Sequence, residues 1–104
     1  MQMEIDRKVV VFENVVRGRV FKARVRVVNK GKRSIRVRVK HTRFPNFAIK
    51  HTYFGSLAPN LGIYFEVHFL AHALEPLPMK IEDSVAVVCE DCTILLPIVV
   101  NMLP

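Results

Sequence analysis

The feature that most constrains the fold is an alternation of apolar and basic side chains within residues 9–40. After a turn at Arg17-Gly18, one parity holds Phe21, Ala23, Val25 and Val27, and the other holds Lys22, Arg24 and Arg26. After a second turn at residues 29–32, Ile35, Val37 and Val39 alternate with Arg36, Arg38 and Lys40. Because successive side chains of a β-strand point to opposite faces, both runs are predicted to be strands with one dry face and one positive face.

The rest of the chain predicts further short strands separated by turns. Residues 9–16 form a β-branched run that Glu13-Asn14 interrupts, which indicates a kink or a change of sheet. Pro45 precedes a short edge strand at residues 47–50, Leu57 is expected to fill the core, and residues 63–70 alternate cleanly. Residues 84–89 and 93–100 have the spacing of a hairpin. About seven such strands, without a sustained helical period, favour an all-β sandwich.

The composition bounds the class of protein. The sequence is long enough for a single domain covering residues 1–104, with a core that needs no disulfide or structural metal. The formal net charge is +7, and residues 17–50 contain no acidic residue, which predicts attraction to an acidic partner. No apolar run approaches the ~20 residues of a membrane span, and the N-terminus lacks the apolar core of a signal peptide. We therefore expect a cytoplasmic protein, and we leave open that the domain belongs to a larger multidomain chain with sister domains.

Short motifs follow one another in a specific order along most of the chain. They are Val11-Phe12-x-x-Val15-x-x-Gly18, Val28-Asn29-x-Gly31, Ile35-x-Val37-x-Val39, Pro45-x-Phe47-x-Ile49, Leu57-x-Pro59, Phe65-x-Val67-x-Phe69, Asp83-x-Val85-x-Val87 and Leu96-Pro97-Ile98. Each motif is common in β-sandwiches, but their order resembles the PapD-like superfamily, and within it the ASH (abnormal spindle and hydin-type) and MSP (major sperm protein) domains. Two positions depart from that pattern: Asn60 follows Pro59 where a glycine is usual, and residues 90–92 replace the Asp-Gly turn of the last hairpin.

The resemblance implies both a fold and a type of function. The implied fold is an immunoglobulin-like, seven-stranded antiparallel β-sandwich that contacts other proteins and has no catalytic centre. ASH domains occur in large proteins of cilia, flagella and centrosomes. The resemblance therefore implies a cytoskeletal location, at an axoneme or a centrosome, and a partner such as tubulin or another ciliary or centrosomal protein. MSP relatives include receptors for acidic linear peptides in membrane-contact or trafficking adaptors.

The candidate partner-binding residues are the outward-facing cations. They are Lys22, Arg24, Arg26, Arg36, Arg38, Lys40 and Arg43. Arginine favours bidentate contact with carboxylate or phosphate groups, so an acidic protein surface suits this set. The cations form one patch if the two basic strands pair, and two patches on opposite outer faces if the strands lie in opposite sheets, as the resemblance implies. A merely solvated outer face is the alternative to a binding surface.

The remaining reactive residues predict neither catalysis nor a bound group. Cys89 and Cys92 form a single C-x-x-C at the last hairpin turn. Zinc needs two further ligands and a redox motif normally accompanies a βαβ unit, so reduced thiols are favoured over a strained disulfide or a shared metal half-site. The histidines are scattered, and His68 is expected to point outward beside Glu66. We therefore expect no enzyme, no cofactor and no metal.

These observations predict a non-catalytic interaction module whose arginine-rich faces contact acidic partner surfaces, with microtubules as a candidate. The alternative is an MSP-type receptor that binds acidic linear peptides by charge and by addition to a sheet edge. Four aromatic residues lie near the edge strand, namely Phe44, Phe47, Tyr53 and Phe54. Most are expected to fill the core, but one or two exposed among Arg43, Lys50 and His51 would form a peptide-docking rim. Nucleic-acid binding ranks lower, because the basic strands lack interleaved surface aromatics for base stacking. A structural spacer is the simplest competing interpretation.

Overall fold

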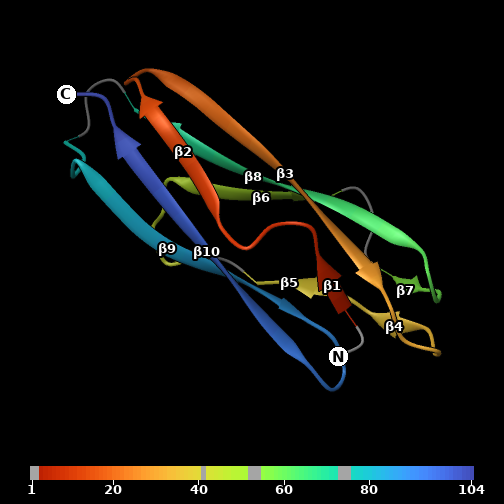
Figure 1. Ribbon diagram of the computed structural model, residues 1–104. Coiled ribbons are helices and arrows are strands. Elements are labelled where there is room, and N and C mark those ends of the chain that lie inside the picture. Colours follow the sequence, from red (N-terminus) through yellow and green to blue (C-terminus); the bar gives the residue numbers. More distant parts are fainter. Residues whose placement is uncertain (1–2, 41, 52–54, 73–75) are drawn as a thin grey trace.

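The computed structural model describes residues 3–40, 42–51, 55–72 and 76–104, and over these residues the chain is all-β (Figure 1). The strands are β1 (Met3–Ile5), β2 (Val10–Val15), β3 (Arg19–Asn29), β4 (Ile35–Arg36), β5 (Arg38–Val39), β6 (Phe47–His51), β7 (Ser56–Leu57), β8 (Gly62–Ala71), β9 (Lys80–Val88) and β10 (Thr93–Met102). None of the described residues forms a helix that could cross a membrane.

Two four-stranded sheets form the sandwich. Sheet I has the order β1-β3-β8-β6 and is antiparallel throughout, whereas sheet II has the order β2-β10-β9-β5. The long strands of both sheets run along the length of a molecule that measures 48 × 21 × 19 Å (Figure 1). The predicted β-sandwich and the predicted 84–100 hairpin are confirmed, because β9 and β10 pair continuously from Val88 and Thr93 onward.

The predicted alternation decides which side chains fill the space between the sheets. Val25 and Val27 are fully buried on β3, whereas Arg24 and Arg26, which alternate with them, are exposed. Sheet I also contributes Phe65, Val67 and Phe69, and sheet II contributes Val85, Val87, Leu96, Ile98 and Val100. Burial of each such side chain stabilises the fold by about 1.5–3 kcal/mol. Leu57 lies in this core, as predicted.

Residues 34–40, predicted as one strand, divide between two sheets. Residues of β4 pair with β7 in a separate two-stranded sheet, whereas residues of β5 pair with β9 in sheet II. The partner changes at Val37, whose side chain is buried. The alternation continues through the change, so Arg36 and Arg38 both remain exposed.

The first predicted strand contains a kink within one sheet. Asn14 has a φ of 53°, and the register between β2 and β10 shifts between Val100 and Met102. Asparagine adopts this left-handed conformation more readily than most residues. β2 runs parallel to β10, so this pair departs from the expected antiparallel pairing. The three-residue β1, which pairs with the end of β3, was not predicted from the sequence.

Asn29 fixes the loop that leads from β3 to β4. Its side chain is fully buried. Its Nδ2 donates to the carbonyl oxygens of Arg33 at 2.7 Å and Leu57 at 2.8 Å, and its Oδ1 accepts from the Gly31 N–H at 2.9 Å. Its main chain bonds to residues 60–61 of the connector before β8. One side chain therefore joins the end of sheet I to the small β4-β7 sheet.

Candidate interaction surfaces

The outer face of sheet I carries a basic surface, which we call the basic face. Its exposed cations are Lys22, Arg24 and Arg26 of β3 and Lys50 of β6, and its β8 members are Tyr64, Glu66 and His68. The register aligns them in rows, because Arg24 and Lys50 flank Glu66 while Lys22 lies beside His68. Cross-strand neighbours on one face lie about 5 Å apart, so these side chains form one continuous surface.

Tyr64 orders two arginines of the basic face. The Cζ atoms of Arg24 and Arg26 lie 5.0 Å and 5.9 Å from the centroid of the Tyr64 ring. The Arg26 guanidinium also packs over Gly62. A Cβ atom added to Gly62 would lie only 2.8 Å from Arg26 Nε, so glycine leaves room for this side chain. Such cation–π contacts stabilise a pair by about 0.5–1 kcal/mol at exposed sites. The ring therefore holds both guanidinium groups in place while leaving them accessible to a partner.

Glu66 is the acidic side chain in the middle of the basic face. His68 Nε2 lies 2.9 Å from Glu66 Oε1. The hydrogen bond from His68 lowers the pKa of Glu66, partial burial opposes the shift, and the charges of His68, Arg24 and Lys22 lower the pKa further. His68 therefore already engages this carboxylate, whereas the sequence had predicted only that the two side chains lie side by side on the outer face. Among the described residues, none of the four cations of the basic face forms an ion pair.

The other four candidate cations lie away from the basic face, around β4 and β5. Arg36 and Arg38 belong to these strands, and Lys40 and Arg43 follow in the loop toward β6. All four side chains are exposed. Main-chain hydrogen bonds fix the backbone at Lys40 and Arg43. The Lys40 N–H donates to the Ala86 carbonyl oxygen at 2.8 Å, and the Arg43 N–H donates to a carboxylate oxygen of Asp83 at 3.0 Å.

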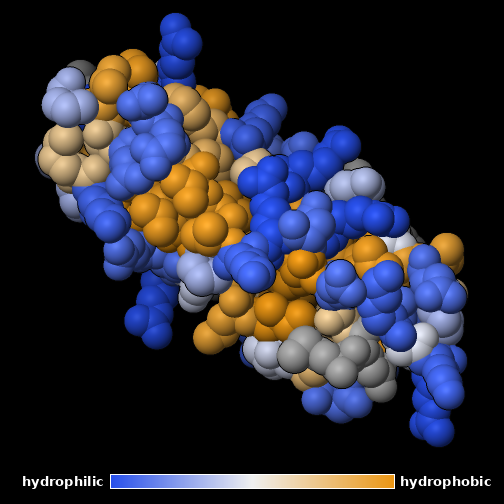
Figure 2. Space-filling model, viewed as in Figure 1, coloured by the Kyte–Doolittle hydropathy of each residue, from blue (hydrophilic) through white to orange (hydrophobic). Residues whose placement is uncertain are grey.

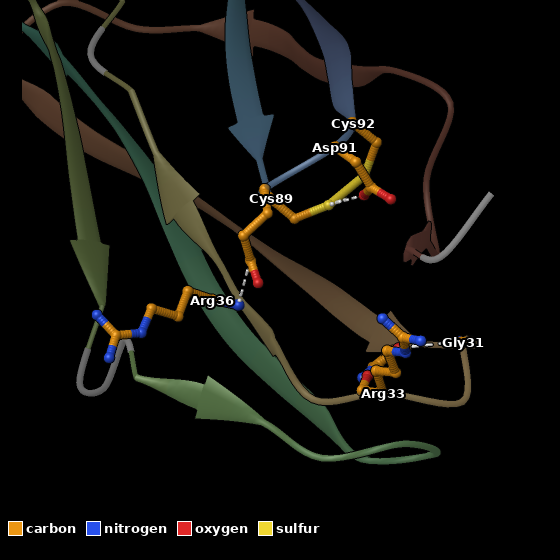
Figure 3. The surroundings of a disulfide bond; sticks show 8 residues. Gly31, Arg33, Arg36, Cys89, Asp91 and Cys92 are labelled. Carbon is orange, nitrogen blue, oxygen red and sulfur yellow. Dashed lines mark hydrogen bonds between the residues drawn. A yellow bond between two sulfur atoms is a disulfide. The ribbon is translucent and has the colours of Figure 1, made fainter.

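A groove opens where the chain passes from β4 to β5. Its volume is about 770 Å³, and its lining residues are Arg36, Val37, Arg38, Gly55, Ser56, Val88, Cys89 and Glu90. The Arg36 N–H donates to Glu90 Oε1 at 2.7 Å, as Figure 3 shows, while the guanidinium extends away from the cysteine pair. Because the strand leaves one sheet for another here, the Glu90 carboxylate takes the place of a ladder hydrogen bond.

The seven predicted binding residues therefore form two groups rather than one patch. β3 pairs with β1 and β8, and it does not pair with β4 or β5. Lys22, Arg24 and Arg26 project from sheet I, and Arg36, Arg38, Lys40 and Arg43 lie along the strands and loop that lead from the small sheet past sheet II. Of the two arrangements left open by the sequence, the structure has the divided one.

The expectation of two reduced thiols is wrong in this structure, because a disulfide joins Cys89 and Cys92 (Figure 3). The bridge spans the turn between β9 and β10, where the Cys89 N–H also donates to the Cys92 carbonyl oxygen at 2.9 Å. Asp91 Oδ1 lies 3.4 Å from Cys89 Sγ. Within the described ranges no fourth metal-ligating side chain joins this cluster. The turn that replaces Asp-Gly is thus closed covalently.

A second, smaller groove lies where β6 meets the basic face. Its volume is about 360 Å³, and its lining residues are Arg24, Lys50, His51, Tyr64, Phe65 and Glu66. The sequence placed Lys50 only beside a possible peptide-docking rim, and it did not predict Tyr64 as a binding residue. The outward parity of Tyr64 was readable from the sequence, but its position beside Arg24 and Arg26 depends on the β3–β8 register. Phe47 is buried and Phe44 half-buried, whereas Tyr53 and Phe54 lie outside the described residues.

The outer face of sheet II differs in character. Val11, Leu95 and Val99 project from it, and Leu95 is 65% exposed. Figure 2 shows two apolar areas, separated by a band of hydrophilic residues, over the side of the molecule where β2, β10 and β9 lie in Figure 1. On β9, Glu82 lies opposite Val99 and its carboxylate is 3.3 Å from Lys80 Nζ. The two outer faces therefore suit different kinds of contact.

No protein-family model matches the sequence, and no curated protein matches it. Solved structures do resemble the fold. The ASH/PapD-like domain of human CEP192 (PapD-like domain 7) has a TM-score of 0.76 at 12% identity, covering 97% of this chain and 84% of that domain. The periplasmic chaperone SfaE has a TM-score of 0.64 at 13% identity, covering 98% of this chain and 57% of the chaperone. At these identities the similarity shows the fold.

Proposed function

We propose that this chain, which has a PapD-like fold, is a non-catalytic protein-interaction module that contacts an acidic partner through its arginine-rich surfaces. The basic face carries this proposal. Its cations have no ion-pair partner among the described residues, and Tyr64 holds two of them in exposed positions. Arginines held in this way lose less conformational entropy when they bind a carboxylate than freely moving side chains would.

The partner that best suits this chemistry is an acidic protein surface of the cytoskeleton. The resemblance to ASH domains supports a place at a cilium, flagellum or centrosome. Microtubules are the partner to test first, because their acidic tails present carboxylates to a basic surface. Steering of this kind raises association rates and depends on ionic strength.

Cosedimentation with microtubules tests the proposal, and the divided arrangement of the cations supplies a matched control. One variant carries Lys22→Glu, Arg24→Glu and Arg26→Glu on the basic face. The other carries Arg36→Glu, Arg38→Glu and Lys40→Glu and changes the net charge equally. We expect binding to weaken more than about tenfold in the first variant and much less in the second.

Microtubules stripped of their acidic tails should bind the unmodified protein less well. Equal losses in both variants would show that the basic face is not the main contact, and that overall charge or both groups of cations drive binding. No binding to intact microtubules at low salt would remove them as the partner.

A second candidate function is an MSP-type receptor for acidic linear peptides. The observation that favours it is the small groove beside β6, where Lys50 and Arg24 border a strand at the edge of sheet I.

A further inference from the structure

We propose that β6 binds an extended acidic peptide as an additional strand of sheet I, with the peptide's carboxylates directed at Lys50 and Arg24. This inference rests on the proposed function as a protein-interaction module and specifies the partner as a linear segment rather than a folded surface. It assigns the binding to the main chain of Phe47–His51 as much as to the basic side chains.

The position of β6 makes strand addition geometrically available. β6 is the last strand of sheet I and pairs with β8 on one side. Five residues give it enough length for two or three new ladder bonds. An edge strand exposes a row of N–H and C=O groups that can template another strand.

The hydrogen-bond pattern identifies which β6 groups face outward. The Leu70 N–H donates to the Asn46 carbonyl oxygen at 2.8 Å, so residues 46 and 70 form a hydrogen-bonded pair. In an antiparallel ladder such pairs alternate with pairs that are not bonded to each other. Ala48 and Lys50 therefore bond to β8, and the N–H and C=O of Ile49 point away from it. The Phe47 N–H is already used by the Phe44 carbonyl oxygen at 3.3 Å.

The charges around this edge select an acidic occupant. Lys50 is exposed on β6 itself, and Arg24 lies across Glu66 in the same row of the sheet. Both line the groove of about 360 Å³ at this edge. In a peptide added to β6, alternate side chains would face the same side as Lys50, where carboxylates are favoured. The side chains between them would face the same side as Ile49, which is half-buried and packs against the core, so apolar residues are favoured there.

The other edges are less suitable for such a ligand. β1 has three residues and β5 has two, which is too short for a stable added strand. β2 has six residues, but Glu13 lies on its outward side and would repel a carboxylate. The combination of length, an outward main-chain pair and adjacent cations is therefore found at β6 among the described edges.

Amide hydrogen exchange measured by NMR tests the main-chain contact directly. The probe is a synthetic peptide of alternating glutamate and valine, with an alternating lysine and valine peptide as the control. We expect the Ile49 amide to exchange rapidly in the free protein and to become at least about tenfold more protected with the glutamate peptide. The amides of Ala48 and Lys50 serve as internal controls, because the β8 ladder protects them in both states.

Substitutions test the contribution of charge and of the outward amide. Lys50→Glu should weaken binding of the glutamate peptide by about tenfold or more, whereas Lys8→Glu, an identical charge change at the loop between β1 and β2, should change it less than about twofold. Ile49→Pro removes the outward N–H without removing a β8 ladder bond, and Ile49→Ala controls for the lost side chain. We expect the proline variant to bind more weakly than the alanine variant at equal folded fraction.

The outcomes separate this inference from the proposed function. Binding of the glutamate peptide without new protection at Ile49 would mean docking by charge alone, and strand addition would be wrong. No binding of the peptide by a protein that still binds microtubules through the basic face would also overturn the inference while leaving the function intact. Protection at Ile49 in a protein that does not bind microtubules would support the edge site and remove the microtubule as partner.

Discussion

The Asn29 side chain joins the end of sheet I to the small β4-β7 sheet. Its buried side chain satisfies two carbonyl oxygens and one N–H. Asn29→Ala would leave these groups without partners, so we expect the free energy of unfolding to fall by about 2–4 kcal/mol in urea denaturation. Asn60→Gly is the control, because a φ of 67° suits glycine, and the change should stay within about 1 kcal/mol. A loss of similar size in both variants would contradict this account of Asn29.

Glu66 should make the stability of sheet I depend on pH. The pKa of its carboxyl group is lowered in the folded protein, first by the hydrogen bond from His68. The unfolded state therefore binds the proton more tightly. The stabilisation is fully present above the unfolded pKa of about 4.3 and is lost as pH falls through the lower folded pKa. We expect the melting temperature of the unmodified protein to fall more steeply below about pH 4.3 than that of Glu66→Gln. Parallel profiles would count against the interaction.

Single residues show where sequence reasoning succeeds and where it stops. The parity of β3 correctly placed Arg24 and Arg26 outward, because strand alternation is a local property. The cation–π contacts with Tyr64 need the β3–β8 register, which local parity does not specify. Asn60 departs from the glycine usual in the family pattern, and its positive φ is a left-handed conformation that glycine adopts readily. The hydrogen-bond role of Asn29 was likewise hidden, since its partners lie up to 28 residues away.

The strand between residues 34 and 40 illustrates the same limit for a whole element. Its alternation predicted a strand with correct inner and outer faces, but alternation does not report which strand is the partner. Pairing with β7 and then with β9 divides it into β4 and β5, and this division creates the groove at Arg36 and Arg38. At the end of β4, the Arg36 N–H donates to the side chain of Glu90, which lies 54 residues further along the sequence. The groove was therefore not predictable from the basic pattern alone.

The β9–β10 hairpin should depend modestly on its disulfide. A bridge that closes a ring of four residues restricts the unfolded chain less than one that closes a long loop, which limits its contribution to about 2 kcal/mol. We expect the oxidised protein to be more stable than the reduced protein by up to that amount in urea denaturation. A variant with Cys89→Ser and Cys92→Ser should not respond to reductant. A response in that variant would show that the reductant acts elsewhere.

The whole molecule presents two outer faces, one that would bind a partner through charges and one that would bind it by burying apolar surface. The basic face places Lys22, Arg24, Arg26 and Lys50 on one side of the sandwich, and the face of sheet II places Val11 and Leu95 on the other. Contacts between exposed charges weaken with salt, whereas burial of apolar surface is weakened little or is strengthened. Salt dependence therefore reports which face a partner uses, without any substitution.

A salt titration of microtubule binding follows from this difference. The Debye length falls from about 10 Å at 0.1 M to about 3 Å at 1 M ionic strength. If the basic face makes the contact, the dissociation constant should rise steeply over this range, and the variant with Lys22→Glu, Arg24→Glu and Arg26→Glu should lose most of the salt dependence along with the affinity. A dissociation constant that stays flat as salt increases would place the contact on the apolar face of sheet II instead. In that case Leu95→Glu, rather than the charge reversals on β3, would be the variant that abolishes binding, because it puts a carboxylate into a surface that must lose its water.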